Sequence, residues 1–263
     1  MSEPQSAALL RVEREGPVAH LVLDRPGKLN ALTLAMLARL DALCAELEAD
    51  TDVRAVVLRS TSARAFCAGA DVHEWSALGA EGMWRRWIAE GHRVFARLAA
   101  LPMPSIAAID GMAFGGGLEL ALCCDLRIAA RTARFALPEV KIGIVPGWGG
   151  PARLAALVGT SRAKQMALTG APIDAATALA WGLASEVVDG DALVARASAL
   201  AAEIAAGPRT AVQVTKQLVD AAAAGAPPAI LDALAAGFIS GTDDLAEGVA
   251  AFRDKRPPRF NRN

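Results

Sequence analysis

Hydrophobic and polar positions in the first part of the chain alternate as they do in paired strands. Leu10 and Val12 alternate with charged residues, and residues 18–23 are almost wholly apolar. Gly16-Pro17 lies between the two runs. This arrangement predicts two antiparallel strands joined by a tight turn.

The next segments switch between helical and strand periodicity. A helix is predicted after Thr33, with one apolar face made of Met36, Leu37, Leu40, Leu43, Cys44 and Leu47. Short apolar runs at 53–58, 105–110 and 125–130 are typical of strands covered on both faces. Residues 83–101 have helical spacing, and one face is assigned to Trp84, Trp87, Ile88, Gly91, Phe95 and Leu98. Such alternation of strands and helices predicts an α/β layered domain.

After about residue 190 the pattern becomes helical and rich in alanine. Helices are predicted near 190–206, 208–224, 228–240 and 243–254, and no strand pattern remains. Asp244 and Glu247 have the spacing of a capping box. We therefore predict a core over 1–190 and a helical region over 191–263. We expect this region to pack on another subunit; the alternative is that it folds back on its own core.

Composition narrows the class of protein. The 263 residues are 54% hydrophobic and 21% charged with a net charge of -1, which suits a globular protein and gives no basic footprint for nucleic acid. No apolar run reaches the ~18 residues of a membrane-spanning helix, and residues 1–16 lack a signal-peptide pattern. The four cysteines form no CxxC pair and there are three histidines, so we expect no zinc site and reduced thiols in a cytoplasmic protein.

Three glycine-containing stretches are candidates for chemistry. They are FCAGAD at 66–71, GGGLE at 115–119 and LPEVKIGIVPGWGG at 137–150. Glycine at the start of a helix leaves main-chain N–H groups free to bind an oxyanion. The alternative is that these glycines only satisfy turn geometry.

Two carboxylates lie within these stretches. Glu119 is in a helical segment that is apolar nearly all round, where a charge is costly unless a partner satisfies it. Its position near the positive end of the helix dipole is an alternative explanation. Glu139 follows Leu137-Pro138. If the two side chains converge on the glycine donors they form an acid–base pair beside an oxyanion site, but the sequence does not show that they converge.

Five stretches in this order resemble the crotonase superfamily, specifically its enoyl-CoA hydratase branch. They are RPGKLNALT, FCAGADV, AIDGMAFGGGLELALCCDLRIAA, FALPEVKIGIVPGWGG and EGVAAFRDKRPPRF. The resemblance implies an α/β spiral of repeated strand–strand–helix units, followed by helices that build homotrimers or homohexamers. It also implies acyl-CoA thioester substrates and no metal or other cofactor, because coenzyme A belongs to the substrate.

The same resemblance assigns roles to residues. The N–H groups that bind the thioester oxygen fall on Ala68 and Gly116, and the substrate-binding stretch also includes Gly69, Ala70 and Asp71. Glu119 takes a proton from water and Glu139 gives one to C2 of the substrate. The implied reaction is reversible syn hydration of 2-enoyl-CoA to 3-hydroxyacyl-CoA, as in the β-oxidation of fatty acids.

Three other functions stay open at the level of sequence. One is a double-bond isomerase that uses chiefly the Glu139 position. Another is a different crotonase reaction, such as hydrolysis or decarboxylation. The third is a non-catalytic oligomeric binding protein, since fold does not imply function.

The segment PGWGGPARL departs from the commonest family pattern. Many relatives have a small residue at the position of Trp148 and Thr-Gln at Pro151-Ala152. Pro151 suits the first turn of a helix. The Trp148 side chain either narrows the acyl pocket or packs against a helix.

Several other residues have two interpretations. Trp75, Trp84 and Trp87 line an acyl tunnel or belong to the core. Phe252, Lys255 and Arg256 match a stretch that in relatives lies near the nucleotide end of coenzyme A, or they form a solvated basic tail. His73 is expected to be exposed and non-catalytic.

Overall fold

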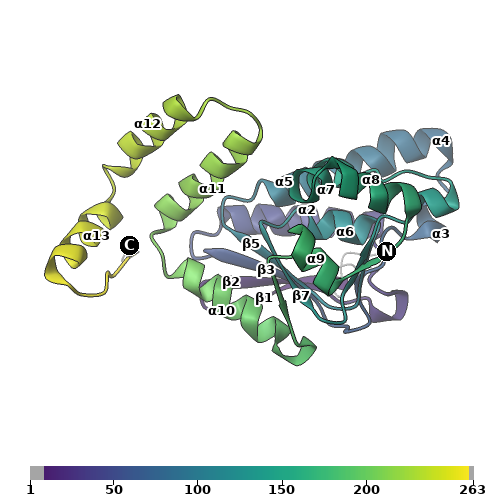
Figure 1. The fold of residues 1–263 in the computed structure, drawn as a ribbon, viewed down its shortest axis with the longest axis horizontal. Coiled ribbons are helices and arrows are strands. Elements are labelled where there is room, and N and C mark those ends of the chain that lie inside the picture. The colour runs from purple at the N-terminus through teal and green to yellow at the C-terminus, as the bar shows by residue number, and fades with distance from the viewer. Residues whose placement is uncertain (1–8, 261–263) are drawn as a thin grey trace.

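The computed structural model describes residues 9–260 and contains two β-sheets (Figure 1). The larger sheet has six strands in the order β1-β2-β3-β5-β7-β10. Their bounds are Leu10–Glu15, Val18–Leu23, Ala55–Ser60, Ser105–Ile109, Leu126–Ala130 and Glu186–Val188. β1 and β2 pair antiparallel and all other neighbours are parallel. The predicted hairpin is confirmed, and the strand predicted at 53–58 begins two residues later.

A smaller four-stranded sheet has the order β4-β6-β8-β9. Its strands are Ala65–Cys67, Met112–Phe114, Arg134–Ala136 and Ile173–Asp174. The chain runs three times from the larger sheet to the smaller one and then into helix, through β3–β4, β5–β6 and β7–β8. This repetition confirms the predicted spiral of strand–strand–helix units.

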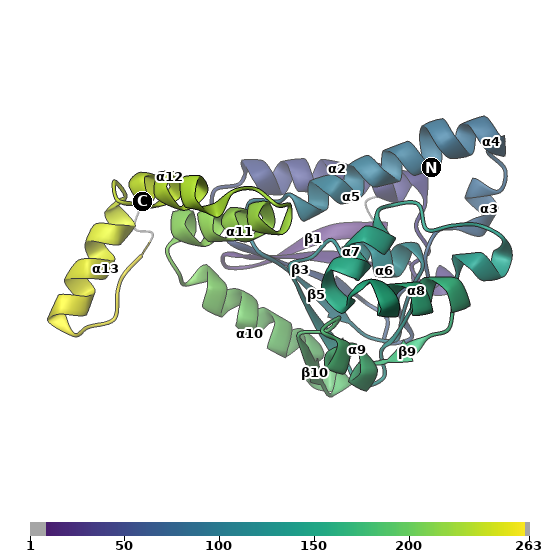
Figure 2. The ribbon, with the colours of Figure 1, turned by 45° about the horizontal axis from the view of Figure 1, so that its top comes forward.

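Helices cover both faces of the larger sheet (Figure 2). On one side α2 (Leu34–Ala49) packs against α5 (Ala89–Ala99), and the Thr33 hydroxyl caps α2 by accepting the Met36 N–H at 3.1 Å. On the other side α10 (Leu193–Ala205) buries its alanine face against β2, β3, β5 and β7. The remaining elements before it are α3 (Val72–Trp75), α4 (Gly79–Gly82), α6 (Gly116–Ala121), α7 (Gly150–Val158), α8 (Thr160–Thr169), α9 (Ala175–Trp181) and the 3₁₀ turns Pro26–Lys28, Glu139–Ile142 and Gly190–Ala192.

The helix predicted over 83–101 begins with a π-helical turn, Met83–Ile88, before α5. The wider turn holds more residues than an α-helical one, so it changes which side chains share a face. Trp87 is buried as predicted, whereas Trp84 is 67% exposed. The assignment of Trp84 to the buried face was therefore wrong.

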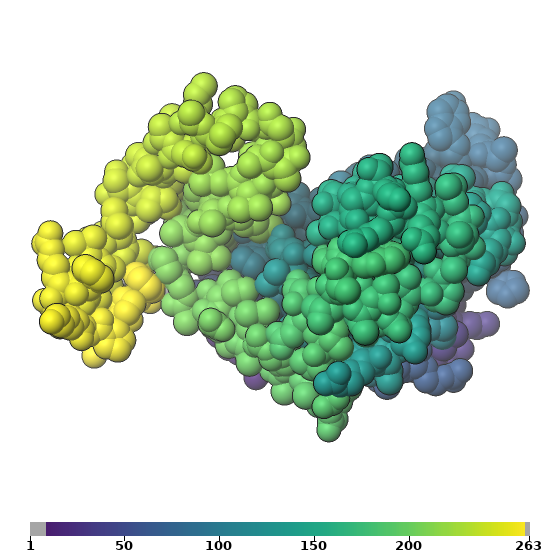
Figure 3. Space-filling view, in the orientation of Figure 1, coloured from purple at the N-terminus to yellow at the C-terminus, as the bar shows by residue number. Residues whose placement is uncertain are grey.

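Three helices at the C-terminal end project from this body: α11 (Arg209–Ala223), α12 (Pro228–Ile239) and α13 (Asp243–Asp254) (Figure 3). The helical assignment is confirmed, but the cap of α13 is Thr242, whose hydroxyl accepts the Leu245 N–H at 3.3 Å. The capping box at Asp244 and Glu247 was wrong because α13 begins one residue earlier than Asp244. The domain boundary after residue 190 stays a prediction, and the packing of α10 joins that helix to the sheet.

Large apolar side chains lie exposed on the three projecting helices. They include Val219, Ile230, Leu234, Phe238, Leu245, Val249 and Phe252. Lys216 ties α11 to the body through an ion pair with Asp125 at 2.8 Å. Among residues 9–260, none of the helices has the length and apolar character needed to span a bilayer.

Candidate active site

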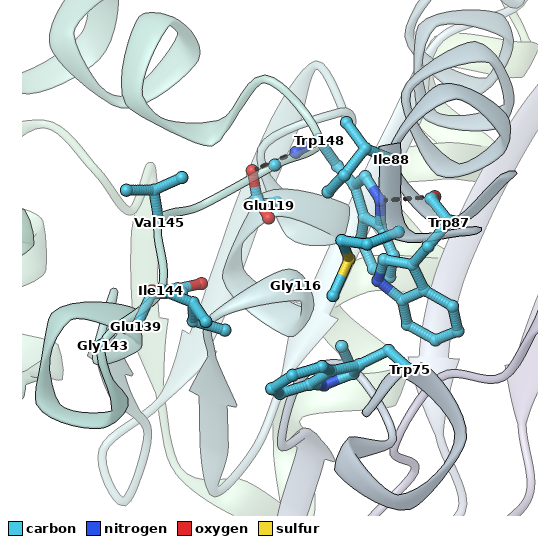
Figure 4. Close-up of a pocket in the computed structure, with 13 residues that line it drawn as sticks. Trp75, Trp87, Ile88, Gly116, Glu119, Glu139, Gly143, Ile144, Val145 and Trp148 are labelled. Carbon is cyan, nitrogen blue, oxygen red and sulfur yellow. Dashed lines mark hydrogen bonds between the residues drawn. The ribbon is translucent and has the colours of Figure 1, made fainter. Parts of the chain in front are cut away.

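A cavity of about 340 Å³ lies where α6, the 3₁₀ turn at Glu139, the segment before α7 and the helices after β4 meet (Figure 4). Its walls are mostly apolar and include two carboxylates. The lining residues are Ala70, Trp75, Met83, Trp87, Ile88, Gly116, Glu119, Glu139, Gly143, Ile144, Val145, Gly147 and Trp148. A concave apolar site with a few convergent polar groups is the usual form of a small-molecule site.

Glu119 is the fourth residue of α6 and is 2% exposed. Its Oε1 atom accepts the N–H of Trp148 at 2.9 Å and the N–H of Gly150 at 2.8 Å. A Cβ atom at Gly150 would lie 2.4 Å from Cγ of Glu119, so only glycine allows this approach. Main-chain donors from a separate segment therefore satisfy the carboxylate that the sequence places in an apolar helix.

The environment of Glu119 pulls its pKa in two directions. Burial raises the pKa, while the N–H groups of Gly150 and Trp148 and the charge of Arg153 oppose the rise. Arg153 also fixes this segment, because its Nη1 donates to the Trp148 carbonyl at 2.8 Å. The pKa of Glu119 is raised overall, and the loop that orients the carboxylate limits this rise.

Glu139 begins the 3₁₀ turn after Pro138 and is 8% exposed. Its Oε1 lies against Gly115, where a Cβ atom would be 2.8 Å away, and its buried Oε2 has no hydrogen-bond partner among residues 9–260. Burial, assisted by the nearby charge of Glu119, raises the pKa of Glu139 to about 7. This carboxyl group is therefore suited to hold a proton at neutral pH.

The two carboxylates, 20 residues apart in the chain, face one cavity (Figure 4). Glu119 comes from α6, Glu139 from the turn opposite, and the tryptophan side chains close the other side. The structure thus supplies the convergence that the sequence left open.

Two main-chain N–H groups meet beside the carboxylates. Gly116 opens α6, so its N–H has no partner within the helix, and Ala70 leaves the loop after β4. A Cβ atom at Gly116 would lie 3.5 Å from the Ala70 nitrogen, which shows how closely the two segments approach. Neither N–H donates to an acceptor within residues 9–260. The pair is available to bind a ligand oxygen.

The assignment of Ala68 as the first of these donors was wrong. The Ala68 N–H already donates to the Leu29 carbonyl at 2.9 Å, and Ala68 does not line the cavity. Gly69, which lies between the two alanines, has a φ of +111°, a conformation that favours glycine. Of the two alanines, it is therefore Ala70 that reaches the cavity beside Gly116.

The loop that carries Ala70 is held by polar groups whose role the sequence analysis missed. Asn30 is fully buried, and its Nδ2 donates to the Phe66 carbonyl at 2.9 Å. Arg25 pairs with Asp71 at 2.8 Å. Asp71 also caps α3 by accepting the His73 N–H at 3.1 Å, so it supports the loop from behind. One feature of the sequence could have revealed this role: in RPGKLNALT an asparagine lies between apolar residues, where an unpaired amide is unfavourable.

The other candidates fall into two groups. Trp75 and Trp87 line the cavity, and Trp84 does not. His73 is exposed as predicted and lies outside the cavity lining. Phe252, Lys255 and Arg256 are on and after α13, and none reaches the cavity of the same chain (Figure 1). Arg256 instead pairs with Glu247 at 2.6 Å. Within the described range, no group of three or more His, Cys, Asp or Glu side chains is arranged to hold a metal ion.

The fold and the cavity together define a class of protein. A spiral of strand–strand–helix units brings an apolar cavity, two buried carboxylates and two free main-chain N–H groups together. Such an arrangement is typical of enzymes that carry out acid–base chemistry on a ligand whose oxygen is bound by main-chain N–H groups.

Comparison with known proteins gives the family. The sequence model of the enoyl-CoA hydratase/isomerase family matches residues 13–263. The chain is 40% identical to a short-chain-enoyl-CoA hydratase of Clostridium acetobutylicum, covering 93% of this chain and 94% of the relative. It is 39% identical to a probable enoyl-CoA hydratase of Mycobacterium tuberculosis, covering 95% and 96%. This chain belongs to the enoyl-CoA hydratase/isomerase family and is an enzyme.

Solved structures agree with this assignment. The crystal structure of an enoyl-CoA hydratase from Bacillus anthracis superimposes with a TM-score of 0.91 at 34% identity, covering 96% of this chain and 98% of that one. A structure from Geobacillus kaustophilus gives a TM-score of 0.90 at 34% identity, covering 97% and 98%. The fold is therefore the crotonase fold that the sequence motifs indicated.

Proposed function

We propose that this enzyme is an enoyl-CoA hydratase that adds water, reversibly and syn, across the double bond of a short- or medium-chain 2-enoyl-CoA. The product is the 3-hydroxyacyl-CoA. The observation that carries this proposal is the unequal setting of two carboxylates in one cavity. Oε1 of Glu119 accepts two N–H groups, while the buried Oε2 of Glu139 has no partner within residues 9–260.

The first task of the site is to bind the thioester oxygen. Attack of water at C3 moves electrons through C2 and the carbonyl carbon onto that oxygen, forming an enolate. The N–H groups of Ala70 and Gly116 are placed to stabilise this charge. In other enzymes one such donor contributes about 3 kcal/mol to the transition state.

The second task is proton transfer. We assign Glu119 as the base: burial raises its pKa, but its N–H donors and Arg153 limit this rise and keep the carboxylate the more readily ionised of the pair. It takes a proton from the attacking water, and Glu139 gives a proton to C2 of the enolate. Two carboxyls in one cavity resist double ionisation, so a single shared proton is the expected state of the pair at neutral pH. Hydration balances with water alone, so the proposed reaction needs no metal or redox cofactor.

The test is product identity. The purified enzyme is incubated with 2-butenoyl-CoA, and loss of absorbance of the conjugated thioester is followed together with mass spectrometry of the product. The proposal predicts 3-hydroxybutanoyl-CoA. A parallel reaction with 3-hexenoyl-CoA tests the isomerase alternative, because accumulation of 2-hexenoyl-CoA with no hydroxylated product from either substrate would contradict hydration.

The proposed assembly rests on the projecting helices. The exposed apolar side chains of α11, α12 and α13 need a partner surface, and a second copy of the chain would supply it in a homotrimer or a dimer of trimers. Light scattering after size exclusion should give a mass three or six times 27.2 kDa. A monomer at micromolar concentration would contradict this part of the proposal.

A further inference from the structure

The indole of Trp148 forms the inner wall of the cavity and is 2% exposed. Its ring centroid lies 5.5 Å from that of Trp87 and 5.0 Å from that of Phe95, the latter in an edge-on contact. Its Nε1 donates to the Trp87 carbonyl at 3.2 Å (Figure 4). Packing and a hydrogen bond therefore fix the indole in one orientation.

Two glycines make the slot in which this indole lies. A Cβ atom at Gly91 of α5 would lie 2.2 Å from the indole Nε1. A Cβ atom at Gly116 of α6 would lie 2.7 Å from Cζ3 at the other end of the ring. The ring thus spans the space between the two helices and reaches the glycine that offers its N–H to the substrate oxygen. Both alternatives left open by the sequence hold, because the side chain packs against helices and also limits the cavity.

The volume of the cavity limits the length of the acyl chain that it can hold. An apolar cavity of about 150 Å³ accommodates benzene, with its six carbon atoms. The cavity beside Trp148 measures about 340 Å³, which corresponds to roughly a dozen non-hydrogen atoms on that scale. The thioester group and the reacting water use about four of these, so room remains for an acyl chain of about four to eight carbons.

We propose that the Trp148 indole is the specificity-determining group that limits this enzyme to such short acyl chains. The inference rests on the proposed function of the cavity. In this proposal the main chain and the side chain of Trp148 have different roles. The main-chain N–H of Trp148 holds Glu119, whereas its side chain occupies the space into which a longer acyl chain would extend.

The wild-type protein gives the first test. The ratio of kcat/KM for 2-butenoyl-CoA to that for 2-dodecenoyl-CoA should be at least about 100, since an oversized chain must displace a fixed wall. Equal kcat/KM values for the two substrates would overturn the inference without any variant.

Substitution gives the second test. Trp148→Ala and the milder Trp148→Leu keep the main-chain N–H that holds Glu119. Each should reduce the chain-length ratio at least tenfold, whatever happens to the absolute rates. Trp84→Ala is the matched control, because Trp84 is 67% exposed and outside the cavity, and its ratio should equal that of the wild type. An unchanged ratio in a folded Trp148 variant, checked by circular dichroism, would overturn the inference.

A binding measurement separates this inference from the proposed reaction. Saturated butanoyl-CoA and dodecanoyl-CoA cannot be hydrated, so their dissociation constants report only the fit of the chain. If the wild type favours the shorter ligand and Trp148→Leu loses this preference, the size limit stands even where no hydration is seen. If hydration occurs but neither protein discriminates between the ligands or the substrates, the size limit fails and the reaction stands.

Discussion

The two buried carboxylates of the cavity differ in the hydrogen-bond donors and charges that surround them. On the α6 side, Glu119 is met by two N–H groups and lies near the Arg153 charge. On the opposite side, the buried Oε2 of Glu139 meets no hydrogen-bond donor within residues 9–260. Burial raises the pKa of both carboxyl groups, but N–H donors and the Arg153 charge oppose the rise only at Glu119. In the proposed mechanism, this difference in main-chain surroundings is what divides the roles of base and acid between the two residues.

Removal of either carboxylate should have the largest effect on the rate of hydration. Glu119→Gln and Glu139→Gln should each lower kcat for hydration by roughly 10²–10⁴-fold, the usual contribution of a general acid or base. Affinity for a saturated acyl-CoA should persist, because the N–H donors remain. Steady-state kinetics and a binding titration check the two statements.

Glu81→Gln is the matched control for these substitutions. Glu81 makes a surface ion pair with Arg85, and its side chain is 80% exposed. Turnover should stay within about twofold of the wild type, since surface pairs contribute little. If Glu119→Gln behaves like this control, the base has been misassigned.

The support behind Glu119 should matter next. Gly150→Ala places a Cβ atom 2.4 Å from Glu119 Cγ and must displace the carboxylate. We expect kcat/KM to fall by about 100-fold, because small misplacements of a catalytic group have costs of that size. Gly27→Ala in the 3₁₀ turn Pro26–Lys28, where a Cβ atom meets nothing within 4 Å, is the control and should have no effect on rate.

Substitution of Arg153 should have a smaller effect, which is seen in the pH dependence of kcat/KM. Burial raises the pKa of Glu119 and the Arg153 charge opposes this rise, so Arg153→Met should move the acidic limb of the pH–kcat/KM profile to higher pH. Arg131→Met is a suitable control, because Arg131 pairs with Asp189 on the surface. A loss of rate at all pH values with no movement of the limb would show that Arg153 acts only on the fold.

Stability should show the smallest effect. Burial raises the pKa of Glu139 from an ordinary 4.5 to about 7, so the folded state binds more protons than the unfolded state between these values. Stability should therefore fall as pH rises through this window and level off above it. Glu139→Gln should remove part of this decline in thermal melts measured against pH. A wild type that grows more stable over the same window, relative to this variant, would contradict the raised pKa.

Much of the fold was predictable because local chemistry and packing agree. The hairpin at residues 10–23, the Thr33 cap and the four C-terminal helices follow directly from periodicity and turn residues. The exposed face of Trp84 was not predictable, since periodicity assumes an α-helix and the chain forms a π-helical turn there. The cap of α13 was missed because Asp244 and Glu247 also have the spacing of a capping box, and Asp244 lies two residues after the true cap, Thr242.

The sequence predicted the carboxylates of the candidate site but only one of its two main-chain donors. Glu119, Glu139 and Gly116 could be named from motifs, and the structure brings all three to one cavity. Ala68 and Ala70 are indistinguishable as residue types, and only the hydrogen bond from Ala68 to Leu29 shows which alanine is free. The position of the Trp148 indole likewise depends on distant segments that sequence spacing does not place.

The central claim is that the two carboxylates divide the roles of base and acid because their environments differ. Infrared or carbon NMR titration of the carboxyl groups, assigned with Glu119→Gln and Glu139→Gln, tests it most directly. The account predicts that the signal lost in Glu139→Gln titrates at a pH of about 7 and that the signal lost in Glu119→Gln is already ionised at lower pH. The reverse order, or two carboxyls that ionise together at the ordinary value for glutamate, would contradict it.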